Sequence, residues 1–342
     1  MGKDNVQFKN RGFGTMTLSD FPTVLQNFFG NLRTLLKYNY EQDCIKNLHS
    51  LNQRIANLQE ELFLAKREIV ELYFDFHKEE DNPYIDELAY LKDASNIDAF
   101  PYPQIKRIDN PITGFDHKLK LTFVIHNNNR LYFPKGWSPE SASNAYRNYI
   151  ERENLLGGGY TEKAPHQYIT ESFHVEQNDI VVDAGCAEAL FALDSIGKAK
   201  HVYLLEANPI WLKPLQATFA PYKDKVTIIQ KFLGGENSEN TITLNSLFDK
   251  FSEESFFIKM DIEGSEESVI QGSKNFFTSQ NKIKLACCTY HKVHHAETIS
   301  SLLKDMGYKF EFSDGYMLFP WDKNQQPPYF RKGLIRATSA GK

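Results

Sequence analysis

The sequence predicts an α/β protein with a mostly parallel, doubly wound sheet in its second half, an antiparallel C-terminal edge and a helical N-terminal region. Three observations predict this fold. Beyond Gln167, short apolar strands alternate with helical stretches, which is typical of a parallel sheet. In the segment 308–319, strand-like residues flank a Ser-Asp-Gly turn, which indicates an antiparallel edge. Between residues 40 and 78, apolar residues follow a heptad repeat, which predicts a coiled-coil helix.

The heptad segment needs a packing partner. Its apolar stripe consists of two series, Leu48, Ile55, Leu62, Ile69 and Phe76 together with Leu51, Leu58, Ala65 and Leu72. The preceding stretch 21–38 is also compatible with a helix. The stripe can therefore pack against that stretch as an intramolecular helical hairpin, or against a second copy as a homodimer.

The middle of the chain has a different pattern. Prolines and aspartates interrupt 81–110, which we interpret as a linker. The segment 118–133 alternates apolar and polar residues around three asparagines, which predicts a β-hairpin. A short helix is expected at 141–152, and glycines 157–159 mark a break. We predict three parts: residues 1–110 helical and coiled-coil, 111–160 hairpin and connecting helix, and 161–342 the α/β domain.

The second half supplies the elements of the sheet. We expect strands at 180–183, 201–206, 226–230, 256–261, 283–290, 308–312, 316–319 and 333–337. We expect helices at 187–196, 209–219, 265–271 and 296–306.

Composition excludes several classes of protein. The 342 residues carry a net charge of −5, which gives no overall electrostatic reason to expect nucleic acid as the partner. No apolar run has the length of a membrane helix. The first residues lack the apolar core of a secretory signal, and the four cysteines form no C-x-x-C pattern. We therefore expect a cytoplasmic protein.

The ends of the first two predicted strands indicate a nucleoside site. Ligands of such sheets bind at the carboxyl ends of the strands. Asp183 and Gly185 follow the first strand, and Glu206 ends the second, 23 residues after Asp183. An acid at this interval typically reaches ribose hydroxyls. Because only one glycine of the G-x-G-x-x-G pattern is present, the spacing favours a nucleoside without phosphates over a dinucleotide.

The fourth predicted strand ends in charged residues. Lys259, Asp261 and Glu263 are spaced by two and therefore share one face of an extended strand. One interpretation is a partly buried Lys–Asp ion pair that orders the strand end, while Glu263, Glu266 and Glu267 only favour the start of the next helix. We favour a functional interpretation, because charges at this position of the fold lie in the ligand crevice.

The fifth strand leads to three histidines. His291 lies at the strand end, near the predicted positions of Asp261 and Glu263, whereas His294 and His295 are expected to be solvated residues at a helix start. A histidine beside a carboxylate can accept a proton from a hydroxyl. The same groups could instead bind a divalent metal that polarises the hydroxyl.

These motifs resemble the FkbM-type S-adenosylmethionine-dependent methyltransferases. The matching segments lie between residues 167 and 337, in order VVDAGCAEALFAL, YLLEANPIWLKPL, TLNSLF, FFIKMDIEGSEESVIQGS and TYH. The resemblance implies a Rossmann-like class I methyltransferase sheet and methyl transfer to a hydroxyl oxygen, often of a sugar or polyketide. Two departures are Ala189, where the family usually has glycine, and Asn245, where it usually has aspartate.

The resemblance also implies roles for individual residues. The implied cofactor-binding residues are Asp183, Gly185, Cys186, Ala187, Glu206, Ala207, Asn208, Lys231 and Phe232. The implied catalytic residues are Asp261, His291, Lys259 and Glu263. No residue is assigned as a metal ligand, although a divalent metal is compatible with the site.

Two functions of different classes follow. The first is a methyltransferase that uses S-adenosylmethionine and acts on a hydroxyl of a sugar, glycan or small natural product. The second is a catalytically degenerate cofactor-binding or coiled-coil assembly protein. A dinucleotide-dependent oxidoreductase is disfavoured by the missing glycines.

Overall fold

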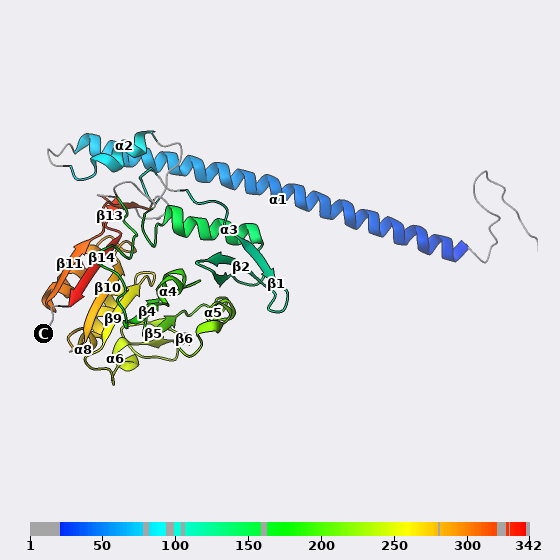
Figure 1. The fold of residues 1–342 in the computed structure, drawn as a ribbon. Helices are drawn as coiled ribbons and strands as arrows, with labels where there is room; N and C mark the ends of the chain where they lie inside the picture. Colours follow the sequence, from blue (N-terminus) through cyan, green and yellow to red (C-terminus); the bar gives the residue numbers. More distant parts are fainter. Residues whose placement is uncertain are drawn as a thin grey trace, which may run out of the picture. The chain divides into compact units, whose positions relative to one another are not determined.

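The computed structural model describes residues 21–77, 82–93, 99–103, 107–158, 163–279, 281–319, 326–327 and 329–339. The chain divides into two compact units, residues 1–66 and 67–342. Figure 1 shows the order of the elements along the chain. Within the described residues, no helix has both the length and the hydropathy of a membrane-spanning segment.

Helix α1 (Phe21–Phe76) is continuous through the whole predicted coiled-coil segment. The intramolecular hairpin of 21–38 against 40–78 is therefore wrong. The reason is visible in the sequence, since residues 36–40 contain neither proline nor glycine to break the helix. The described side chains of the heptad stripe are exposed, among them Leu51, Leu58 and Leu62.

The predicted linker also contains structure. Helix α2 (Ile85–Asp93) buries Glu87 and Leu91, which are one helical turn apart. Leu91 packs in a small core with Val70 from the C-terminal end of α1. The Glu87 carboxylate accepts a hydrogen bond from the buried Tyr102 hydroxyl. The interpretation of 81–110 as a linker is therefore wrong for its described residues, because this short segment has an apolar face and a buried acid that pairs with Tyr102.

The central sheet has seven strands in the order β11 (Tyr308–Phe312), β14 (Leu334–Ser339), β10 (Lys282–Cys288), β9 (Ser255–Met260), β4 (Ile180–Ala184), β5 (His201–Leu205) and β6 (Val226–Ile229). The strands from β10 to β6 are mutually parallel. Strand β14 pairs antiparallel with both β10 and β11. This arrangement confirms the predicted α/β class and its antiparallel C-terminal edge.

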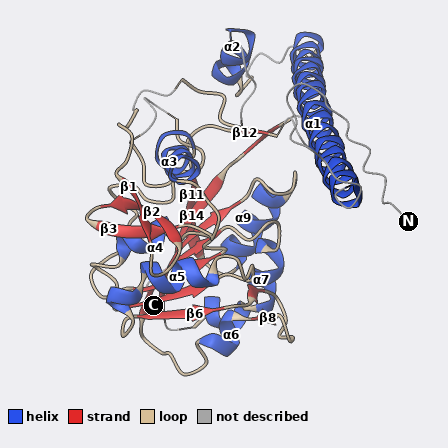
Figure 2. Cartoon of the chain, turned by 90° about the vertical axis from the view of Figure 1, so that its right-hand side faces the viewer, coloured by secondary structure: helices blue, strands red, loops and turns tan. Residues whose placement is uncertain are grey.

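Helices cover both faces of this sheet (Figure 2). One core contains residues of α4 (Leu190–Ser195) and α5 (Leu212–Thr218). The opposite core contains residues of α6 (Leu244–Leu247), α7 (Glu266–Gly272), α8 (Lys274–Phe277) and α9 (His295–Asp305). The central strands are mostly apolar on both faces, as expected where each face is buried.

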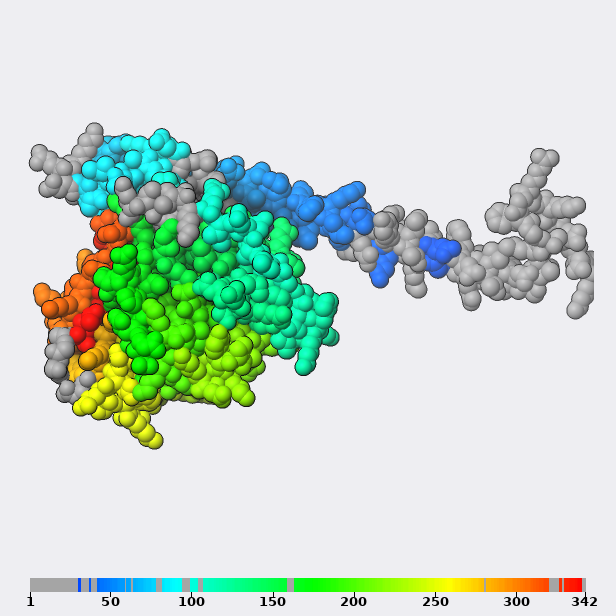
Figure 3. All heavy atoms as spheres, viewed as in Figure 1, coloured from blue at the N-terminus to red at the C-terminus, as the bar shows by residue number. Residues whose placement is uncertain are grey.

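A small antiparallel sheet precedes the central one. It consists of β1 (Thr113–Asp116), β2 (Leu121–His126) and β3 (Asn129–Tyr132). Asn127 and Asn128 have φ of 45° and 67°, as a two-residue hairpin turn requires, so the predicted hairpin is confirmed. Helix α3 (Pro139–Arg147) follows and ends in a π-helical turn, Asn148–Arg152. Figure 3 shows this teal sheet at the surface beside the green segments that follow it.

Two pairs of short strands and a 3₁₀ turn complete the description. Strand β12 (Met317–Leu318) pairs with β13 (Phe330–Arg331), and β7 (Phe232–Leu233) pairs with β8 (Thr241–Ile242); a 3₁₀ turn spans Ala220–Tyr222. The expectation that 316–319 joins the central sheet is wrong. After β11 the chain turns at Gly315, which has a φ of +87°, and the Leu318 amide donates to the Ala99 carbonyl instead.

Candidate active site

A buried ion pair supports the turn after β4. Lys259 Nζ lies 3.2 Å from Asp183 Oδ1 and both side chains are buried. Lys259 also donates to the Gly185 carbonyl at 2.7 Å. Burial raises the pKa of Asp183 above its usual value, although the Lys259 ammonium opposes this. Burial lowers the pKa of Lys259, but the carboxylates of Asp183 and Asp261 outweigh it and raise that pKa.

Gly185 brings two strand ends into contact. Its φ is +67°, and a Cβ there would overlap the backbone carbonyl of Asp261 after β9. Only glycine permits both this conformation and this approach. Two later residues of the same turn, Ala187 and Ala189, also have positive φ, 43° and 61°. For alanine this conformation costs about 1–2 kcal/mol, which explains why glycine suits position 189. Ala189 is buried at the start of α4.

A cavity of ≈ 800 Å³ opens above this turn. Seven of the predicted cofactor residues line it: Gly185, Ala187, Glu206, Ala207, Asn208, Lys231 and Phe232. Glu206 forms part of the cavity wall. Its carboxylate is held there by hydrogen bonds that it accepts from the Ala187 amide at 3.0 Å and from the Asn208 amide at 2.7 Å. Asp183 and Cys186, predicted for the same site, are buried and do not line this cavity.

A second cavity, ≈ 630 Å³, lies on the other side of Asp261. Asp261 and Glu263 line both cavities, and His291 lines the second. The remaining lining residues are Ala99, Phe100, Asn148, Arg152, Glu153, His166, Tyr290, Met317, Phe319 and Arg331. Lys259, predicted as catalytic, lines neither cavity, because its ammonium lies against Asp183. The two cavities thus meet at one carboxylate pair.

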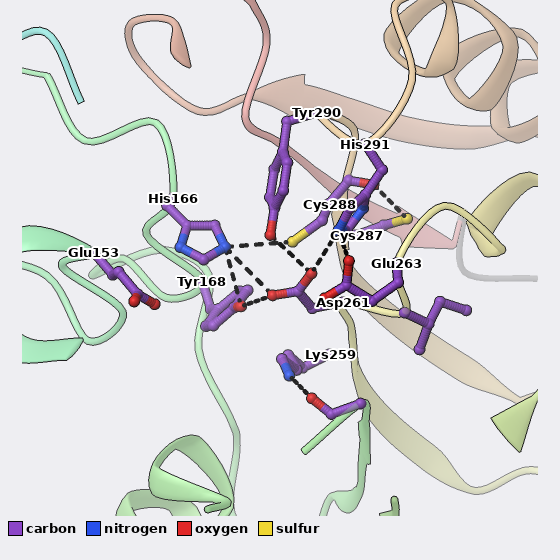
Figure 4. A network of polar contacts seen from close by, with 12 residues as sticks. Glu153, His166, Tyr168, Lys259, Asp261, Glu263, Cys287, Cys288, Tyr290 and His291 are labelled. Carbon is purple, nitrogen blue, oxygen red and sulfur yellow. Dashed lines mark hydrogen bonds and ion pairs between the residues drawn. The ribbon is translucent and has the colours of Figure 1, made fainter. Parts of the chain in front are cut away.

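Four side chains contact the carboxylate of Asp261 (Figure 4). The hydroxyls of Tyr168 and Tyr290 donate to its two oxygens at 3.0 and 2.9 Å. The Nε2 atoms of His166 and His291 lie 3.5 and 3.3 Å from them. Burial raises the pKa of Asp261, but the hydrogen bond with His166 and the charge of Lys259 hold it well below its usual range. Asp261 is therefore an ionised acceptor at neutral pH and a weak base.

His291 lies between carboxylates. Its Nδ1 is 3.0 Å from Glu266 Oε1, and its Nε2 is 3.7 Å from Glu263 Oε2 in addition to the Asp261 contact. Burial lowers the pKa of His291, but the hydrogen bond with Glu266 and the charge of Asp261 outweigh it and raise the pKa. Glu263 itself is 94% exposed. His291 is therefore the more basic candidate at the junction of the two cavities.

One expectation near His291 is wrong, because His295 is fully buried rather than solvated. Glu266, at the start of α7, is also buried. The α9 helix turns His295 inward, toward Glu266 Oε2 at 3.6 Å. His294 is exposed, as expected.

Several functional candidates escaped the sequence analysis. His166 and Tyr168 lie in an irregular segment before β4, and Tyr290 lies next to His291. Glu153 also lines the second cavity, and burial raises the pKa of its carboxyl. The only sequence signal for these residues is a polar or ionisable side chain near the motif, because no periodicity marks their positions.

Metal-ligand residue types also gather here. Within the described residues, three groups have ligand atoms within 4.8 Å of one another: His166, Asp261 and Cys288; Asp261, Glu266 and His291; and Glu267, His294 and His295. Both oxygens of Asp261 accept hydrogen bonds from tyrosine hydroxyls.

The sheet order is that of a Rossmann-like class I methyltransferase domain. An FkbM methyltransferase domain is found at residues 165–310, where the chain matches the family model with that description. The resemblance inferred from the motifs is confirmed over this segment. A search among curated proteins finds no match.

Solved structures resemble parts of the chain. The precorrin-6y C5,15-methyltransferase of Geobacter metallireducens is 16% identical, with a TM-score of 0.32, over 48% of this chain and 82% of its own. M. jannaschii TYW2, solved in complex with AdoMet, is 15% identical, with a TM-score of 0.34, over 64% and 85%. Trm5b of Pyrococcus abyssi is 17% identical, with a TM-score of 0.34, over 65% and 56%.

Proposed function

We propose that this protein transfers a methyl group from S-adenosylmethionine to a hydroxyl oxygen of a sugar, a glycan or a small natural product. The observation that carries the proposal is the junction of two cavities at Asp261 and Glu263, with His291 beside them. One cavity suits the cofactor and the other a polar acceptor. Methyl transfer requires that the two ligands meet in line, and two cavities joined at one wall supply that positioning.

The first cavity fits the cofactor. Gly185 lines this cavity, and Glu206 offers carboxylate oxygens to ribose hydroxyls. Phe232 is largely exposed at the cavity wall and offers a ring face to adenine. When bound, S-adenosylmethionine supplies a methyl group on a positively charged sulfur.

His291 is the proposed general base. The hydroxyl oxygen of the acceptor forms a bond to the methyl carbon while the carbon–sulfur bond breaks and its electron pair stays on sulfur. His291 Nε2 takes the hydroxyl proton and later releases it to solvent. Asp261, held ionised by His166 and Lys259, stabilises the imidazolium that forms.

Cofactor binding provides the first test. We expect calorimetric titration to detect binding of S-adenosylmethionine and S-adenosylhomocysteine but not of NAD. Glu206→Ala should weaken this binding by roughly a hundredfold or more, since it removes the ribose acceptor and the support of the Ala187 and Asn208 amides. Glu239→Ala is the control and should bind like wild type, because Glu239 is an exposed acid that lines neither cavity. Equal binding by wild type and Glu206→Ala would contradict the assignment.

The acceptor is identified by transfer of labelled methyl groups to nucleotide sugars, glycans and small hydroxylated natural products. The same assay after dialysis against a chelator separates the His291 mechanism from a metal-dependent one: retained transfer supports the base, and transfer lost on chelation and restored by a divalent ion contradicts it. Cofactor binding without transfer to any acceptor would favour the degenerate binding or assembly protein.

We also propose that the heptad stripe of α1 forms a homodimeric coiled coil over residues 40–78. The exposed stripe has the spacing of such an interface. Near the C-terminal end of α1, Val70 packs within its own chain while Ile69 and Leu72 stay exposed, so intrachain packing uses a different face of the helix.

Sedimentation equilibrium tests the dimer. We expect the full chain to sediment as a dimer and the double variant Leu58→Lys, Leu62→Lys to sediment as a monomer, because charges at the stripe cannot be buried. Asn57→Lys, one position away from the stripe, should stay dimeric. A monomeric wild-type chain would contradict the proposal.

A further inference from the structure

Glu266 is a buried carboxylate without a role in the proposed reaction. It lies in the first turn of α7 and its side chain has no exposed surface. Its Oε1 accepts from the Ile262 amide at 2.9 Å and lies 3.0 Å from His291 Nδ1. Its Oε2 lies 3.6 Å from His295 Nδ1. The carboxylate is thus placed between two imidazoles that come from the start of α9 and the loop before it.

A buried carboxylate is costly unless a charge or hydrogen bond compensates it. The two histidines differ in what they can provide. Burial lowers the pKa of His295 to about 4, so this ring is neutral near pH 7 and can offer only an N–H group. His291, whose pKa is raised, is the partner that can carry the compensating positive charge.

The two nitrogens of His291 face different environments. Nδ1 faces the buried carboxylate of Glu266, and Nε2 faces Asp261 and Glu263 at the cavities. A proton kept on Nδ1 leaves Nε2 as the nitrogen that gains and loses a proton. A histidine that works as a base needs this fixed tautomer, which in enzymes is set by the hydrogen bond of the other nitrogen.

We propose that Glu266 is a positioning residue that holds the ring and the Nδ1 proton of His291, so that Nε2 exchanges its proton with the acceptor hydroxyl. His295 supports Glu266 from the α9 side. Glu266 touches neither cavity, so it acts only through His291. The inference deepens the proposed function and rests on His291 as its base, but its geometric claim concerns residues of this chain alone.

Nitrogen NMR of the full chain labelled with ¹⁵N-histidine tests the inference without any ligand. The His291 signals are assigned by their loss in His291→Gln. Above the titration midpoint we expect the tautomer with the proton on Nδ1, and a midpoint above the ordinary histidine value of about 6.5. The tautomer with the proton on Nε2 would overturn the proposal, and this result requires no variant of Glu266.

Glu266→Gln removes the charge and keeps an oxygen for the Ile262 amide. Because the carboxylate raises the pKa of His291, its loss should lower the His291 midpoint by about one unit or more. Glu267→Gln is the matched control, since Glu267 lies in the same turn but faces His294 and Thr298. The titration midpoint of His291 in this variant should equal that of wild type. An unchanged midpoint in a folded Glu266→Gln protein would mean a purely structural carboxylate.

Kinetics provide an independent readout once an acceptor is known. In Glu266→Gln the acid limb of kcat/KM against pH should move to lower pH by the same interval as the NMR midpoint, and kcat should fall about ten- to a hundredfold. A lower kcat with an unmoved acid limb would contradict the inference. If the wild-type chain transfers no methyl group, the proposed function fails while the NMR result still decides the role of Glu266.

Discussion

Replacing Lys259 with methionine is expected to lower the free energy of unfolding by about 3–5 kcal/mol. Methionine keeps the length of the side chain but leaves the Asp183 carboxylate buried without its cation 3.2 Å away. The Gly185 carbonyl loses its donor as well. Urea unfolding, followed by circular dichroism on wild type and variant, measures the difference.

Two variants separate charge from packing. Lys259→Met combined with Asp183→Asn removes both charges and should recover most of the loss, because neither partner is left buried and ionised. Lys200→Met removes a lysine from an ion pair of 2.7 Å with Glu254 whose side chains are 50% and 32% exposed, and should cost at most about 1 kcal/mol. A small loss in Lys259→Met, equal to that of Lys200→Met, would show that the buried pair contributes little.

The loss in Lys259→Met should also depend on pH. Without Lys259, burial raises the pKa of Asp183 further above its unfolded value of about 3.9. A carboxyl group whose pKa is higher in the folded than in the unfolded protein destabilises the fold at pH values above the folded pKa, where it is ionised. This destabilisation disappears as the pH falls and the group takes up a proton. The difference between variant and wild type should therefore be larger at pH 8 than at pH 5.

The parts of the site that the sequence predicted are those that the parallel sheet brings together. Gly185, Glu206 and Asp261 each follow the carboxyl end of a strand, and neighbouring parallel strands end at the same edge. His291 follows β10, which pairs with β9, and therefore lies beside Asp261. Alternating strands and helices were enough for this placement, because it depends on topology rather than on side-chain packing.

The role of Lys259 could not be predicted in the same way. The period of two places Lys259 and Asp261 on one face, but the structure pairs Lys259 with Asp183. The two residues are direct register partners on β9 and β4. Strand order and register determine this contact, and both depend on tertiary packing that a single sequence does not display.

The same limit applies to His166 and Tyr168. They lie about a hundred residues before Asp261, in a segment without helical or strand periodicity. Tyr168 reaches Asp261 because its ring is packed in the core against Phe191. Irregular segments carry no pattern from which such long-range contacts follow.

Replacing His291 with glutamine is expected to reduce kcat by about 10²–10⁴-fold with little change in cofactor affinity. His291 lines the second cavity and not the one assigned to S-adenosylmethionine, so calorimetry should detect binding close to that of wild type. His294→Gln is the matched control: His294 is 57% exposed and outside both cavities. It should retain full activity.

The pH dependence tests whether His291 acts as a base rather than as a contact residue. The hydrogen bond with Glu266 and the charge of Asp261 raise the pKa of His291 despite its burial, and only the neutral ring can take a proton. The wild-type rate should therefore rise with pH through a midpoint above 6.5, and His291→Gln should lack this limb. A variant that is slower but keeps the same limb would place the base elsewhere. Full activity in His291→Gln would show that His291 is not the base. Asp261, with the tyrosines and His166 around it, would then be the remaining candidate, and the two cavities would contribute to the reaction by positioning the ligands.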